Sequence, residues 1–151
     1  MRYLLVDRFV ELVVGRKARA LKCVTRGEPF LADLPAFPAT LVLESMFQTA
    51  GHLTRAATDF RRTTMLGKVE SAQFPEEALP GDTIEVDVNI LVARPEGNLC
   101  EARANVGERL VGTSRFLILY MPPEAEPDLT EEQKERRVRF LQAVALRGEE
   151  E

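Results

Sequence analysis

The sequence has few of the residues that build metal centres and disulfide frameworks. Its 151 residues include one histidine and two cysteines. Cys23 and Cys100 lie far apart and match no CxxC or metal-ligand spacing, so neither a disulfide framework nor a zinc site is predicted. We expect both cysteines to be small buried hydrophobic side chains.

Glycine and proline, nine of each, are too few for a disordered or collagen-like polymer, and no internal repeat indicates a solenoid. No apolar run approaches the roughly 20 residues that a membrane span needs, and no signal-peptide pattern follows Met1. We therefore expect a soluble cytoplasmic protein with no membrane partner. The length suits one domain with a single core.

Strong positive charge is also absent. The 20 basic and 24 acidic residues give a net charge of −4, which argues against a nucleic-acid partner. From residue 124 onward there are nine acids and five bases, so residues 1–123 hold 15 of each. This split predicts a balanced domain over residues 1–123 and an acidic C-terminal helix and tail over residues 124–151.

The pattern of apolar residues predicts one buried helix and an antiparallel sheet. Runs bounded by turn residues indicate six strands, at about residues 3–14, 18–26, 64–74, 82–94, 98–106 and 110–120. From Thr40 to Ala57 the segment is apolar on most sides of a helical wheel, which indicates a buried helix with Thr40 as its N-cap, and polar residues return from Arg55 onward. Three prolines within residues 29–38 predict an irregular loop before it. A last helix is predicted from Asp128, and the whole is an α+β arrangement.

Four collinear segments carry a resemblance to a known family. They are Leu4-Leu5-Val6-Asp7-Arg8, Val24-Thr25-x-x-Glu28-Pro29-Phe30, Leu43-Glu44-Ser45-Met46-x-Gln48-x-Ala50-Gly51 and Pro80-Gly81-Asp82. In this order they resemble the FabZ/FabA-type 3-hydroxyacyl-acyl carrier protein dehydratases, over roughly residues 3–120. The C-terminal helix falls outside the resemblance.

The resemblance implies a hot-dog fold, in which an antiparallel sheet wraps one long helix and two subunits pair edge to edge. It implies acyl thioesters of acyl carrier protein or coenzyme A as substrates, held in a tunnel at the interface of a homodimer or a larger assembly of dimers. In the family a histidine removes the proton alpha to the thioester carbonyl. A carboxylate on the helix of the other subunit helps protonate the departing hydroxyl, and no metal or organic cofactor is needed.

Glu44 matches the family carboxylate, and Gln48 matches the helix glutamine one turn later. Residues four apart lie on one face of a helix, so both side chains are expected together. A buried polar pair that only fixes the helix position is the structural alternative. A functional role is favoured because an unpaired buried carboxylate is costly.

The family histidine is missing from this sequence. The family segment Gly-His-Phe-Pro-Gly-His-Pro-x-x-Pro-Gly corresponds here to Ala32-Asp33-Leu34-Pro35-Ala36-Phe37-Pro38-Ala39. Asp33 stands in the place of the base, and about three residues are absent, including the glycine whose helix-start amide polarises the thioester carbonyl. Either Asp33 forms a paired-carboxylate site with Glu44, its pKa raised by burial, or it caps a turn in the loop.

Phe30, Phe37, Phe47 and His52 are candidate substrate contacts. His52, the only histidine, cannot take the family role by position, but it continues the stripe of Glu44 and Gln48 along the helix. A satisfied core histidine is the alternative meaning.

A group of basic residues follows the buried helix: Arg55, Arg61, Arg62 and Lys68. By charge complementarity it is a candidate docking surface for an acidic carrier protein. A solvated surface is the alternative.

Three functions remain open. The first is a FabZ-like dehydratase with an altered site. The second is a hot-dog acyl-thioesterase that uses a carboxylate as nucleophile or as base for water. The third is a non-catalytic subunit that binds acyl chains or pairs with a complete hot-dog partner.

Overall fold

The structure is a computed structural model that describes residues 4–146. Its strands are β1 (Arg8–Val13), β2 (Lys17–Cys23), β3 (Thr64–Gln73), β4 (Thr83–Arg94), β5 (Gly97–Val106) and β6 (Arg109–Tyr120). Its helices are α1 (Ala39–Ala56), the 3₁₀ turn η1 (Pro123–Ala125) and α2 (Glu131–Leu146). The strands form one sheet in the order β1-β2-β4-β5-β6-β3, and each neighbouring pair is antiparallel.

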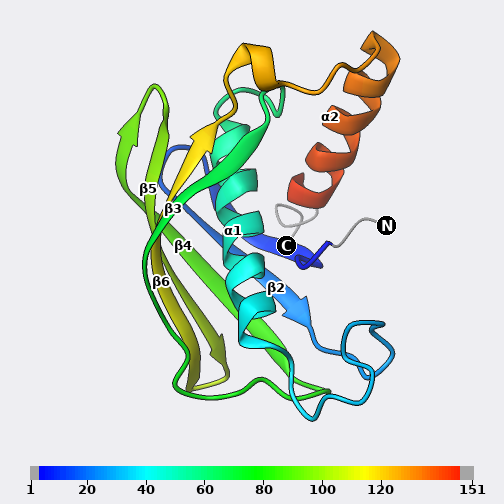
Figure 1. Cartoon of the computed structure of the whole chain (residues 1–151), viewed down its shortest axis with the longest axis vertical. Helices are drawn as coiled ribbons and strands as arrows, with labels where there is room; N and C mark the ends of the chain where they lie inside the picture. Colours follow the sequence, from blue (N-terminus) through cyan, green and yellow to red (C-terminus); the bar gives the residue numbers. More distant parts are fainter. Residues whose placement is uncertain (1–3, 147–151) are drawn as a thin grey trace.

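The sheet curves around α1, and α2 lies on the side of α1 that the sheet leaves open (Figure 1). This confirms the predicted hot-dog arrangement with an added C-terminal helix. The end of the predicted acidic tail lies outside the described residues.

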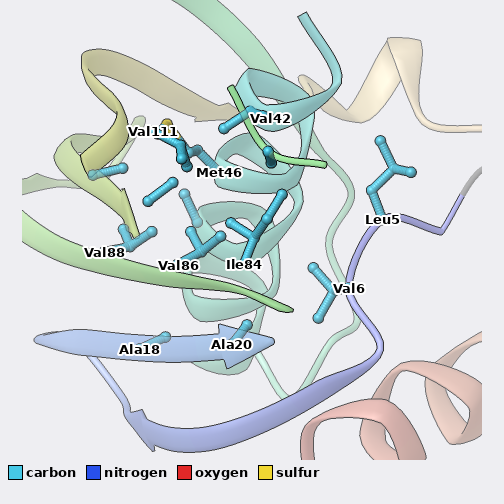
Figure 2. Packing of buried hydrophobic residues seen from close by; sticks show 14 of the residues in the cluster. Leu5, Val6, Ala18, Ala20, Val42, Met46, Ile84, Val86, Val88 and Val111 are labelled. Carbon is cyan, nitrogen blue, oxygen red and sulfur yellow. The ribbon is translucent and has the colours of Figure 1, made fainter. Parts of the chain in front are cut away.

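Buried and outward-facing side chains alternate along the strands, and the buried ones pack against α1. In β4 the side chains of Ile84, Val86 and Val88 are buried, whereas their neighbours in the strand face outward. Val42 and Met46 of α1 belong to the same core cluster (Figure 2). One face of α1 is therefore held by the sheet, and the other remains for polar side chains.

The first strand is shorter than predicted. Residues 4–7 are not part of β1, although Leu5 and Val6 are each 1% exposed. The Leu5 N–H donates to the side-chain oxygen of Gln48 at 2.7 Å instead of to a neighbouring strand. The chain therefore leaves the sheet to lie against α1.

The predicted N-cap was wrong. Pro38 is the N-cap of α1, no side chain caps that end, and Thr40 is an exposed residue inside the helix. The Pro38 carbonyl accepts hydrogen bonds from Leu41 N at 2.9 Å and Val42 N at 3.1 Å, so the helix starts earlier than Thr40. Because the cap is missing, no side chain occupies the amides of the first turn.

Cys23 was expected to be buried, but its position in β2 makes it exposed. Ala18, Ala20 and Lys22 point inward, so Cys23 points outward and is exposed. Cys100 is buried as predicted, and burial raises its pKa to about 12. Lys22, only 4% exposed, pairs with Glu28 and lies 3.7 Å from Asp7. This ion pair anchors the start of the loop that leads to α1.

Helix α2 begins at Glu131, after a capping box. The Gln133 N–H donates to the Thr130 hydroxyl at 3.2 Å, and the Thr130 N–H donates to the Gln133 side chain at 2.9 Å. Val138, Leu141 and Ala145 are 5–7% exposed. The helix therefore docks on the body through a real apolar stripe.

We expect the loss of the buried Lys22–Glu28 ion pair to lower the free energy of unfolding more than the loss of a surface ion pair. Glu28→Gln leaves the Lys22 ammonium buried with a weaker partner, which should lower the free energy of unfolding by about 3 kcal/mol. Asp87→Asn removes the half-exposed pair with Arg19 and should cost less than about 1 kcal/mol. Urea unfolding measures both, and similar losses in the two variants would contradict the assignment.

Candidate active site

A groove of about 530 Å³ runs along the open face of α1. Its walls include Glu44, Gln48, His52 and Arg55 of α1, Thr64–Leu66 of β3, Ile118 of β6, and Arg137 and Leu141 of α2. This volume lies in the range of small-molecule sites. The groove therefore has the size for a ligand and places four polar residues of one helix along it.

Gln48 holds the Glu44 carboxylate in place. Its side-chain oxygen accepts the Leu5 N–H, so its side-chain nitrogen must face the other way. That nitrogen donates to Glu44 Oε1 at 3.2 Å. Both side chains are partly exposed, so Glu44 is oriented by a hydrogen bond and remains open to the groove.

His52 is 3% exposed and is held by its own helix. Its Nδ1 lies 2.8 Å from the Gln48 carbonyl, and a carbonyl only accepts, so the proton is on Nδ1. The ring packs against Phe9 with centroids 5.2 Å apart. Burial lowers the pKa of His52 to about 4, and Nε2 has no hydrogen-bond partner among the described residues. His52 is therefore a neutral imidazole with one unused acceptor.

His52 lies too far from Glu44 to share one reacting carbon with it. Eight residues of helix separate their Cα atoms by about 12 Å, whereas a general base acts within about 3 Å. Both side chains lean toward the helix N-terminus, so the separation is kept at their ends.

Asp33 lies outside this groove. It is exposed in the loop before α1, directly after Ala32, whose φ is +38°. Phe30 and Phe37 of the same loop pack edge to face, with centroids 5.9 Å apart, and Phe37 is 3% exposed. Phe37 borders a second pocket of about 400 Å³ at the start of α1, together with Phe74.

The structure thus divides the sequence-derived candidates into two groups. Glu44, Gln48, Phe47 and His52 line the groove, and Phe47 also packs edge to face on Phe116 at 4.8 Å. The other three candidates lie in the loop that precedes α1 and are Phe30, Asp33 and Phe37.

The four basic residues that were predicted to follow the buried helix lie in different surroundings, and Arg55 belongs to α1 itself. Arg62 stacks over the Tyr120 ring at 4.3 Å, Arg61 pairs with Glu135 at 3.5 Å, and Lys68 is exposed on β3. Arg55 instead lines the groove, where it lies near Arg137. Sequence reasoning missed Arg137. Its only signal was its place beside the apolar stripe of the last helix.

Within residues 4–146 no three His, Cys, Asp or Glu side chains stand close enough to hold a metal ion. Neither helix in that range has the length and apolarity needed to cross a bilayer.

Comparison with known proteins decides the family. The model of the FabA-like domain matches residues 1–113. The chain belongs to the FabA-like family. FabZ 3-hydroxyacyl-[acyl-carrier-protein] dehydratases from Desulforamulus reducens and Clostridioides difficile are each 31% identical to this FabA-like protein. The alignments cover 76% and 72% of its chain, and 84% and 80% of those relatives.

Solved structures show the same fold at low identity. The dehydratase heterocomplex ApeI:P from Xenorhabdus doucetiae superposes with a TM-score of 0.69 at 14% identity, over 80% of this FabA-like chain and 85% of that one. A mutant of the fluoroacetyl-CoA-specific thioesterase FlK gives 0.59 at 14% identity, over 76% and 91%. The fold therefore occurs in a dehydratase complex as well as in a thioesterase.

The depressed pKa of His52 predicts a loss of stability in acid. The unfolded histidine titrates near 6.5 and the native one near 4. Between these values the unfolded chain binds a proton that the native chain does not, so stability falls as the pH drops.

Between pH 7 and pH 4.5 this effect should remove about 2–3 kcal/mol from the free energy of unfolding. His52→Gln should lose that much less over the same interval, measured by urea unfolding at both pH values. Equal losses in the two proteins would show that His52 is not a buried neutral imidazole.

Proposed function

We propose that the protein is a FabZ-like dehydratase that removes water from 3-hydroxyacyl thioesters carried by acyl carrier protein or coenzyme A. The observation that carries this proposal is the Glu44–Gln48 pair. Glu44 lines the groove at the helix position expected for the carboxylate of the family. Gln48 accepts the Leu5 N–H and donates to Glu44, so it fixes the direction of that carboxylate.

The reaction needs a proton acceptor at C2 and a proton donor at the 3-hydroxyl. We assign donation to Glu44: its proton moves to the departing oxygen, the C3–O bond breaks and water leaves. The partner subunit's Asp33 takes the C2 proton as the double bond forms. Proton exchange with solvent then restores Glu44 and Asp33.

The start of α1 supports the same assignment. No side chain caps the helix there, so its first amides are available to polarise a thioester carbonyl. The pocket beside Phe37 and Ala39 opens at this point, on the loop that carries Asp33. These donors replace the amide of the missing family glycine.

In this proposal a homodimer brings Glu44 of one subunit together with the loop that carries Asp33 in the other. Within the described residues, β3 pairs only with β6, so its outer edge is unpaired. The strand is exposed along Met65–Gln73, with apolar side chains at Met65, Leu66 and Val69. Unpaired strand edges bind other strands readily. Pairing of two β3 edges would bring the loop of one subunit toward the α1 helix of the other.

Three further assignments accompany this proposal. We infer that the protein works in fatty acid metabolism in the cytoplasm, that residues 1–123 form the hot-dog domain, and that residues 124–151 form its C-terminal extension. Lys68 is an exposed cation available to an acidic carrier protein, and Arg61 is exposed as well but pairs with Glu135.

Hydration of a trans-2-enoyl thioester, the reverse reaction, tests the function. Glu44→Gln keeps the shape of the side chain but removes its acid, so kcat should fall by about 10²–10⁴-fold. Glu101→Gln changes an exposed carboxylate on β5 and should leave the rate unchanged. Equal rates for wild type and Glu44→Gln would overturn the proposal, and thiol release in the same assay would assign a thioesterase.

A further inference from the structure

The groove has a cationic end, opposite Glu44. Arg55 comes from α1 and Arg137 from α2, and both line the groove. The pKa of Arg55 is lowered to about 10, first because the side chain is buried and second because the Arg137 charge is close to it. Two like charges held together in a cavity point to an anion as the missing partner.

One carboxylate of the described chain, Glu126, lies near this pair, but its hydrogen bonds go to Thr63 instead. Among residues 4–146, neither guanidinium has an ion pair. Glu126 is near enough to raise the pKa of Arg55. Its two oxygens, however, accept hydrogen bonds from the Thr63 N–H at 2.9 Å and the Thr63 hydroxyl at 2.5 Å.

Among the residues that the structure describes, two buried polar atoms at the same end find no hydrogen-bond partner. They are Arg55 Nε, which donates, and His52 Nε2, which accepts. The His52 side chain is 97% buried, being 3% exposed. A methyl group at this end would leave both atoms unpaired, whereas a polar chain end can bind them.

The cationic end faces the reactive end along one helix face. Arg55 follows Glu44 by about three turns, so their side chains share a face at a separation of about 16 Å. Between them the wall is mostly apolar, with Phe47, Leu66 and Ile118 among its residues. An apolar channel that joins a carboxylate at one end to two guanidinium groups at the other fits a hydrocarbon chain with a charged tip.

We propose that this protein acts on acyl thioesters whose chain ends in a carboxylate, and that Arg55 and Arg137 bind that carboxylate. The direction of the chain rests on the proposed dehydratase function, which places the thioester near Glu44. Arg55 Nε donates to the carboxylate, and a guanidinium fork binds this group in two places. One water molecule bridges the carboxylate to His52 by donating to both.

The C-terminal helix α2 supplies part of the proposed carboxylate site. The family match ends at residue 113, whereas Arg137 and Leu141 belong to α2. The helix therefore adds to the family fold both a wall and one of the two cations.

Binding of saturated acyl-pantetheine thioesters tests the proposal without any turnover. A chain with a terminal carboxylate is compared by calorimetry with the methyl ester of the same chain, over a series of lengths. In wild type the carboxylate should bind about 10–100-fold more tightly at the best length, the gain expected of charge-assisted hydrogen bonds. Arg137→Gln should abolish this preference, and Arg55→Gln should do the same if it folds.

Arg139→Gln is the matched control, because Arg139 lies on the same helix but is exposed outside the groove. It should keep the full preference. Equal binding of acid and ester by wild type, or a preference that survives Arg137→Gln, would overturn the proposal. So would a preference lost equally in Arg139→Gln.

A second arm separates the other source of an anion. If adding the 4′-phosphate to the pantetheine of a methyl-ended thioester produces the Arg137-dependent gain and the terminal carboxylate does not, the pair is a phosphate site and the proposal fails. Absence of enoyl hydration would defeat the dehydratase function alone, since this binding preference does not depend on turnover.

Discussion

The structure depends on one side chain, Gln48, that satisfies two partners at once. Its oxygen takes the Leu5 N–H and its nitrogen reaches Glu44. The first bond draws the N-terminal segment off the sheet and onto α1. The second fixes the direction of the carboxylate. Because an amide has one accepting and one donating end, neither bond can reverse without loss of the other.

Around this side chain the helix divides into two functional faces. The face toward the sheet is closed by the core that includes Val42 and Met46. The opposite face carries Glu44, Gln48, His52 and Arg55, which change along the groove from acidic through neutral to basic. Helix α2 covers part of this second face, where it contributes Arg137 and Leu141 to the wall of the groove.

Much of this arrangement could be predicted from the sequence, for physical reasons. Alternation in β4 and the apolar periodicity of α1 are local signals, and Glu44 and Gln48 share a face because helix geometry requires it. The end of β1 could not be predicted, because the partner of the Leu5 N–H is a side chain 43 residues away. The buried state of Lys22 depends on Glu28 and Asp7 closing over it. Arg137 reaches the groove only through the docking of α2, which no local pattern encodes.

The central claim is that Glu44 of one subunit works with Asp33 of the other. The most direct measurement mixes two inactive variants, Asp33→Asn and Glu44→Gln, unfolds and refolds them together, and follows enoyl-thioester hydration. In a two-fold symmetric dimer, each mixed dimer contains one intact site, so random pairing should restore about a quarter of the wild-type activity. Activity that stays absent after mixed dimers have formed, or an Asp33→Asn protein that is fully active alone, would contradict the account.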